Sequence, residues 1–389
     1  MGYGGGGGGG GGSGGSGGGS GASGGSGYRR VGDDRTANLK VNNITSRDGK
    51  RGTDVDGIVE VNTTAHFIPP SGTTAERGSR GRGVFGGGYG SGSPWPTINT
   101  IDYVTIATLG NATDFGDLSV RRSAKCGGSS ATRGCFMAGR FPSSPTVVNV
   151  IDYIEIQSTG NAFDFGDLTI CGLGQNVRGT SNQIRTVYGG GYTQSLSNDW
   201  LNGIGYFAIA TKGNTSEFGS FNAFGRKIFT GSNGTRGIFA NNRGANPGVP
   251  GTYQNTIEYV TIASLGNAQD FGDTTAARHA AGSMTSSTRM VMQGGINPSA
   301  INTIDYLTMA SLGDAIDFGD VDATVRESSA STSSPTRGVF NPGSEGGGTT
   351  NNSIHYITIA TTGNSSDFGD LSAVRGTDAS LSDSHGGLG

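Results

Sequence analysis

Charged residues and long apolar runs are both scarce in this sequence of 389 residues. Only 15% of the residues are charged and the formal net charge is −3. No overall electrostatic field therefore favours nucleic acid or an anionic membrane. No apolar run approaches the ~20 residues of a transmembrane helix, and the N-terminus lacks the charged and apolar regions of a signal peptide. We expect neither nucleic-acid binding nor membrane insertion.

Cysteine and histidine are also rare. The three cysteines, Cys126, Cys135 and Cys171, are an odd number, which excludes a complete disulfide framework. Cys126 and Cys135 could oxidise across a hairpin, but free, half-buried thiols are favoured. The histidines are scattered without metal-ligand spacing: His66, His279, His355 and His385. No nucleophile elbow or Cys/His pairing is present. The sequence predicts no enzyme, no metal and no cofactor.

Glycine, by contrast, is abundant, and its distribution divides the chain into three parts. Residues 1–27 are nearly all Gly and Ser and predict a flexible tail. Residues 28–82 form a leader with short strands predicted at Leu39–Val41 and Gly57–Val61. This leader is too small to support its own core. Residues 83–389 form one repeat domain.

The repeat is visible as six copies of a β-branched and aromatic run, one of them worn. The copies begin at Ile101, Ile151, Ile204, Ile257, Ile304 and Ile354. Each is followed by a Gly-Asn or Gly-Asp turn and then by Asp-Phe-Gly-Asp or a variant. The turn glycines recur about every 50 residues: Gly110, Gly160, Gly213, Gly266, Gly313 and Gly363.

One repeat contains four strand-like segments with turn residues between them. A four-stranded unit of about 50 residues is the blade of a β-propeller. The sequence therefore predicts an all-β fold, a six-bladed propeller. No blade follows the last repeat, so we expect Ala373–Ser384 to complete the first blade, whose other strands come from residues 83–118. This closure would leave no open sheet edge between the chain ends.

The units resemble kelch repeats in the glycine pair after an apolar strand, the Tyr of the third strand and the aromatic-x-x-Leu of the fourth. A Phe stands where kelch repeats usually carry Trp: Phe115, Phe165, Phe218, Phe271, Phe318 and Phe368. The resemblance implies that each Phe fills the gap between blades. Asp-Phe-Gly also occurs in kinases, but the catalytic-loop motif and paired Lys of a kinase are missing here.

An arginine recurs after the Ser-rich turn of each unit: Arg133, Arg185, Arg236, Arg289 and Arg337, with Arg82 before the first strand. This turn and the Gly-Asn turn should lie on the same face of the propeller. We expect a ring of arginines bonded to carbonyls or to carboxylates such as Asp114. An anion site on the propeller axis is the alternative.

The loop between the second and third strands differs in every unit, and all six loops should project from the face opposite the arginines. Several of these loops carry aromatic residues: Tyr89, Trp95, Phe141, Tyr192, Trp200 and Tyr253. A uniform scaffold with divergent aromatic loops favours a binding face. The alternative is unconstrained drift of the loops.

Residues 99–118 are similar to a repeat of virion structural proteins of marine bacteriophages, cyanophages especially. The leader, with Leu39–Thr45 and Pro70–Arg77, is similar to attachment segments of phage tail and fibre proteins. The resemblance implies a virion protein whose N-terminal segment binds other virion proteins and whose propeller is displayed outward.

Three functions follow from these observations. The first is a tail- or fibre-associated protein whose loops contact a host surface glycan or protein. The second is a head decoration or tail structural subunit that contacts only virion proteins. The third is a cellular kelch-type interaction module. The sequence leaves open whether the chain forms a homo-oligomer.

Overall fold

The computed structural model describes residues 81–90, 96–123, 126–140, 148–169, 177–191, 201–223, 225–243, 253–279, 282–325, 330–342, 344–345, 349–376 and 379–388. All of them belong to one compact unit of the chain, Pro70–Gly389. The predicted tail, and the leader up to residue 80, lie outside the described residues and stay predictions.

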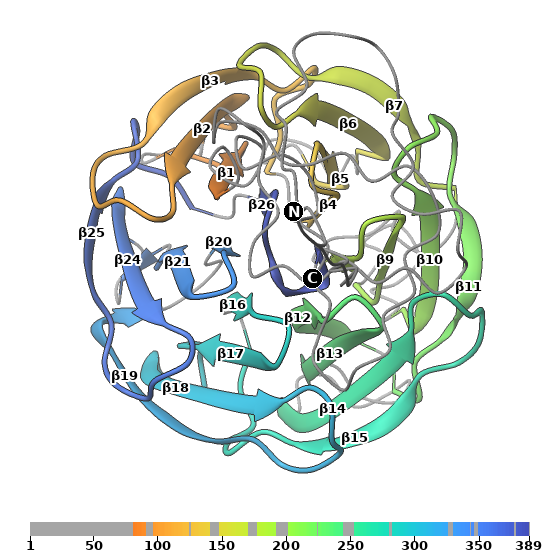
Figure 1. Cartoon of the computed structure of the whole chain (residues 1–389), viewed down its shortest axis with the longest axis vertical. Helices are drawn as coiled ribbons and strands as arrows, with labels where there is room; N and C mark the ends of the chain where they lie inside the picture. The colour runs from red at the N-terminus through yellow and green to blue at the C-terminus, as the bar shows by residue number, and fades with distance from the viewer. Residues whose placement is uncertain are drawn as a thin grey trace, which may run out of the picture. The chain divides into compact units, whose positions relative to one another are not determined.

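Six four-stranded antiparallel sheets stand around a central axis (Figure 1). The first blade contains β26 (Ala379–Ser382), β1 (Arg82–Gly86), β2 (Thr100–Thr105) and β3 (Thr113–Asp117). The second contains β4 (Cys126–Ser129), β5 (Arg133–Met137), β6 (Val150–Glu155) and β7 (Phe163–Asp167). The third contains β8 (Arg178–Ser181), β9 (Arg185–Gly189), β10 (Gly203–Ala208) and β11 (Ser216–Ser220).

The remaining blades follow the same order from the axis outward. The fourth contains β12 (Arg226–Ser232), β13 (Arg236–Arg243), β14 (Tyr253–Thr261) and β15 (Gln269–Asp273). The fifth contains β16 (Gly282–Thr285), β17 (Arg289–Gln293), β18 (Ile301–Thr308) and β19 (Ile316–Val325). The sixth contains β20 (Ala330–Ser333), β21 (Arg337–Asn341), β24 (Ser353–Thr358) and β25 (Ser366–Asp370), with a small hairpin of β22 (Ser344–Glu345) and β23 (Thr349–Thr350) in its loop.

The predicted six-bladed propeller and its closure by the C-terminal strand are confirmed. β26 pairs antiparallel with β1, with Leu381 opposite Val84. In the other blades a local Ser or Asn caps the turn between the first and second strands, as Ser130 accepts the Arg133 amide. In the first blade Asp383, from the opposite end of the chain, accepts the amides of Gly81 and Arg82. A non-covalent contact therefore takes the place of a turn.

The hydrophobic core lies between the blades. Phe115 of the first blade is 2% exposed and packs against Ile154 and Ile156 of the second. Phe165 of the second blade packs in the same way against Phe207 of the third. Each blade thus buries its apolar side chains only against its neighbours, so the closed ring is the unit that is stable.

The Gly of Asp-Phe-Gly is required by the next blade. Gly116 has a φ of 144°, and a Cβ there would lie 2.4 Å from the carbonyl oxygen of Gly160 in the neighbouring turn. The same turn caps the outer strand: the Gly160 amide donates to the Phe115 carbonyl, and the Asp117 amide donates to Asn161 Oδ1. Equivalent Asn or Asp caps occur at all six interfaces. The outer edge of each blade is covered by its neighbour.

Candidate functional site

The repeated arginines form a belt of contacts from blade to blade. Two turns of each blade, from the first to the second strand and from the third to the fourth, lie on one side of the propeller, which we call the turn side. The opposite side is the loop side. On the turn side, Arg133 Nη1 donates to the carbonyls of Ile209 and Ala210 in the next blade, at 3.2 and 3.0 Å. Equivalent bonds run from Arg82, Arg185, Arg236, Arg289 and Arg337. Arg337 bonds to Ile106 and Ala107 and so closes the circle.

Each arginine also lies over the repeated Tyr of its own blade. The Arg133 guanidinium carbon is 4.6 Å from the centre of the Tyr153 ring, and the other five distances are 4.4–4.9 Å. Only Arg133 adds a carboxylate among the ion pairs of the described residues, namely Glu155 at 2.9 Å. These arginines stand at the second strands rather than on the axis, and their donors are directed at backbone carbonyls.

The axis itself is a narrow channel lined by the innermost strands β4, β8, β12, β16, β20 and β26. The cavity has a volume of about 100 Å³, smaller than the few hundred Å³ of most ligand pockets. Its walls are mainly Ser, Thr, Gly and Ala.

The hydroxyls cap the free inner edges of the blades. Ser181 Oγ donates to the Ser129 carbonyl and accepts the Ser129 amide, both at 2.8 Å. The same reciprocal pair joins Ser333 to Thr285. Further hydroxyl-to-carbonyl bonds run from Ser129 to Ser382, from Ser382 to Ser333 and from Ser232 to Ser181. A strand edge that would otherwise be unpaired is satisfied by the neighbouring blade.

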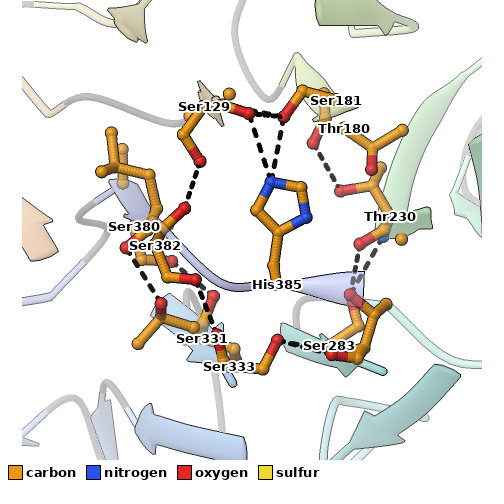
Figure 2. A pocket seen from close by; sticks show the side chains of 18 of the residues that line it. Ser129, Thr180, Ser181, Thr230, Ser283, Ser331, Ser333, Ser380, Ser382 and His385 are labelled. Atoms are coloured by element: carbon orange, nitrogen blue, oxygen red, sulfur yellow. Dashed lines mark hydrogen bonds between the residues drawn. The ribbon is translucent and has the colours of Figure 1, made fainter. Parts of the chain in front are cut away.

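The C-terminal segment fills the turn end of this channel (Figure 2). His385 Nε2 lies 3.3 Å from the Ser129 carbonyl oxygen, and its Nδ1 accepts the Gly387 amide at 3.1 Å. These partners select the neutral tautomer with the proton on Nε2. Burial lowers the pKa of His385 to about 4, although the bond to Ser129 acts in the opposite direction. His385 is therefore a neutral structural plug at neutral pH.

Two of the six predicted binding-face aromatics lie among the described residues. Tyr89 follows β1 on the loop side, and its backbone bridges to Thr97 and Gly376. Tyr253 begins β14, and its ring lies against that of His279, with centroids 5.0 Å apart and the planes inclined by 31°. Both are partly exposed. Trp95, Phe141, Tyr192 and Trp200 lie outside the described residues, so their placement stays a prediction.

Sequence reasoning missed a set of buried polar pairs at the loop end of the blade interfaces. Arg122, seven residues after Phe115, forms an ion pair of 2.9 Å with Asp152 of the next blade. The equivalent pairs are Arg278 with Asp305, also at 2.9 Å, and Arg375 with Asp102. All six of these side chains are fully buried. Burial lowers the pKa of Arg122 and Arg278, while their aspartates act to raise it.

At the remaining three interfaces the contact from the preceding blade comes from a residue four places, not seven, after the repeated Phe. The backbone amide of Asn222 donates to Glu258 Oε1 at 2.7 Å, and the Thr169 hydroxyl donates to the Thr215 carbonyl at 2.9 Å. His355 faces Asp322 across the last interface. The sequence did contain a signal: Arg occurs seven residues after the repeated Phe only where the next repeat carries Asp in its Ile-Asp-Tyr motif. The pattern cannot be seen in one repeat and becomes visible only when each repeat is compared with the next.

The two described cysteines are free and buried. Burial raises the pKa of the Cys126 thiol to about 12 and that of Cys135 further still. In their sheet Cys126 is opposite Met137 and Cys135 is opposite Gly128, so the two do not face each other. The thiols are therefore protonated and packed in the core. Cys171 lies outside the described residues.

Comparison with known protein families finds no matching family model, and comparison with curated proteins finds no match either. Within the described ranges no group of three His, Cys, Asp or Glu side chains could hold a metal ion. The same residues contain no helix long and apolar enough to cross a membrane.

Proposed function

We propose that this chain is a binding protein that presents the loop side of its propeller to a partner. The observation that supports this proposal is that the repeated and the divergent residues of each unit have different contacts. The repeated Arg, Tyr, Phe, Gly and Asn side chains are used in blade-to-blade contacts. The described residues of the divergent loops, such as Tyr89 and Tyr253, stand on the loop side, where rigid scaffolds commonly carry binding loops.

We further propose that the protein belongs to a bacteriophage particle, at its tail or fibres, and that its partner is a host surface glycan or protein. The resemblance of residues 99–118 and of the leader to phage virion proteins supports this proposal. On this view the N-terminal segment binds other virion proteins. A head-decoration or tail role with contacts only to virion proteins is the competing possibility.

The test is binding by the full-length protein, measured against a glycan array, host cells and purified virion proteins. Tyr89→Ala and Tyr253→Ala should weaken host or glycan binding, because both aromatic rings are partly exposed on the loop side. Leu265→Ser is a matched control, since Leu265 is an exposed apolar residue on the turn side. Binding to virion proteins alone would reject the host-surface role. Loss of host binding in Leu265→Ser only would reject the loop side.

A further inference from the structure

The interface between the fifth and sixth blades brings together a serine, a histidine and an aspartate. His355 in β24 stands where three other blades carry a buried Asp, and Asp322 in β19 faces it from the fifth blade. His355 Nδ1 is 2.6 Å from Asp322 Oδ1. On the other side of the ring, Nε2 is 3.1 Å from Ser353 Oγ. The imidazole thus bridges a carboxylate and a hydroxyl.

The local structure holds this series in place. Ser353 and His355 are two residues apart on one strand and so project from the same face. The His355 ring is stacked on Phe340, with centroids 5.7 Å apart and the planes inclined by 23°. Asp322 Oδ1 accepts the Ser365 hydroxyl at 2.7 Å, and the Asp322 amide donates to the same hydroxyl at 3.0 Å. Neither the ring nor the carboxylate is free to turn away.

The exposure of the three side chains suits a reacting group at the surface. The His355 side chain is 9% exposed, whereas that of Asp322 is 39% exposed. Ser353 is partly exposed at the start of its strand, on the loop side. The series therefore lies at the surface of the loop side, and the imidazole is largely shielded from water.

The roles follow from the contacts. The Asp322 carboxylate, 2.6 Å from Nδ1, favours the tautomer with the proton on that nitrogen, which leaves Nε2 as the free base and the Ser353 hydroxyl as its proton donor. This is the arrangement that activates serine in acyl-transfer enzymes, which is recognised by geometry and not by sequence order. We propose that Ser353 is an activated nucleophile toward carboxylic esters, with His355 as general base and Asp322 as the positioning residue.

The reaction is an acyl transfer. Ser353 Oγ forms a bond to the ester carbonyl carbon while its proton passes to His355 Nε2. The bond between that carbon and the alcohol oxygen breaks, and His355 returns the proton to the departing oxygen. Water then attacks the acyl-serine, releases the carboxylic acid and restores the hydroxyl. This activity is separate from the proposed binding function and does not depend on it.

A purely structural explanation is available for the same residues. His355 stands at the position of Asp152 and Glu258 in the other buried pairs, and here the acid, Asp322, comes from the preceding blade. Other blades also carry a hydroxyl at the Ser353 position, at Thr100, Thr256 and Thr303. Reactivity, which stability alone would not produce, separates the two explanations.

The experiment treats the full-length protein with a fluorophosphonate probe, whose phosphorus is attacked by an activated serine with loss of fluoride, and locates the label by peptide mass spectrometry. Hydrolysis of p-nitrophenyl acetate is followed in parallel. We expect label on Ser353 and none in Ser353→Ala. His355→Gln should slow both reactions by about 10²–10⁴-fold, the usual contribution of a general base. Thr303→Ala, which removes the equivalent hydroxyl beside Asp305, should leave both rates unchanged.

Asp322→Asn tests the positioning role. It should lower the labelling rate while the thermal midpoint stays close to that of the parent, and Asp322→Glu should recover part of the rate. Circular dichroism on every variant shows that the sheets are intact. Equal labelling of the parent and Ser353→Ala would overturn the proposal, as would a folded parent that takes no label. If the parent protein is labelled at Ser353 but binds neither host cells nor glycans, the result counts against the proposed binding function and not against the activated serine.

Discussion

Each blade interface has a turn end, on the turn side of the propeller, and a loop end, on the loop side. The two ends are built on different rules. At the turn end all six interfaces use the same parts: an arginine over a tyrosine, a Gly-Asn or Gly-Asp turn over the outer strand and inner-edge hydroxyls. At the loop end the partners change from one interface to the next. Arg faces Asp at three of them, and Asn–Glu, Thr–Thr and Asp–His contacts occupy the others.

The difference shows what the repeat must preserve. The turn-end contacts between blades bond to backbone carbonyls and amides, which every blade presents in the same way, so the same or a closely similar residue serves all six. At the loop end, the Arg–Asp and Asp–His contacts join side chain to side chain, so a change in one blade is tolerated when its neighbour changes too. The Asn222–Glu258 and Thr169–Thr215 contacts each use one backbone group. The loop end can therefore diversify, and the Ser353–His355–Asp322 series is one product of that freedom.

The largest expected effect is at the loop end. Asp152→Ala leaves the Arg122 guanidinium buried without its carboxylate, which should cost about 3–5 kcal/mol of unfolding free energy. Urea denaturation measures it. The double variant Arg122→Met with Asp152→Ala should recover most of this loss, because no buried charge remains. A double variant as unstable as the single one would show that the two sites are not a complementary pair.

The turn end can be broken through a single methyl group. Gly116→Ala places a Cβ against the Gly160 carbonyl, so it should cost about 3 kcal/mol, at the upper end of the range for strained backbone. Gly110→Ala is the control: its φ of 148° is equally unfavourable, but nothing lies within 4 Å of the new Cβ. Its cost should be about 1–2 kcal/mol. Equal losses would mean that the contact between blades is unimportant.

Acid should weaken the turn end through His385. Its pKa is about 4 in the folded protein against 6.5 for the ordinary group, so the unfolded chain binds the proton more tightly. The neutral ring's contribution is present above pH 6.5 and is lost as the pH falls toward 4, by up to about 3 kcal/mol. Asp383, whose pKa burial raises, opposes part of this loss. In His385→Gln the urea midpoint should change less between pH 7 and pH 4 than it does in the parent. The same pH dependence in both proteins would contradict the burial argument.

The smallest expected effect concerns one outer cap. Asn161→Ala removes the acceptor of the Asp117 amide at an exposed position, so a loss of about 0.5–1 kcal/mol is expected. Asp314→Ala removes the equivalent acceptor of the Asp273 amide and should cost the same. Matching values from urea denaturation would sharpen the view that turn-end contacts are interchangeable.

Much of this architecture could be predicted from the spacing of motifs. Six copies about 50 residues apart define the blades, and the unmatched tail predicts the closing strand that becomes β26. The sequence predicts that the repeated Arg side chains bond either to carbonyls or to carboxylates, but it does not distinguish the two. That choice depends on which backbone groups the next blade presents. The buried pairs escaped notice because Arg122 and Asp152 belong to different repeats.

By itself, then, the sequence determined the number of blades, their strands and the need for closure, because periodicity and turn chemistry are local properties of a chain. Tertiary structure alone decided which side chains meet across the interfaces. Ser353 and His355 are neighbours on a strand, but only the docking of the fifth blade brings Asp322 to the imidazole. Chemistry that depends on distances between repeats is set by packing, not by local pattern.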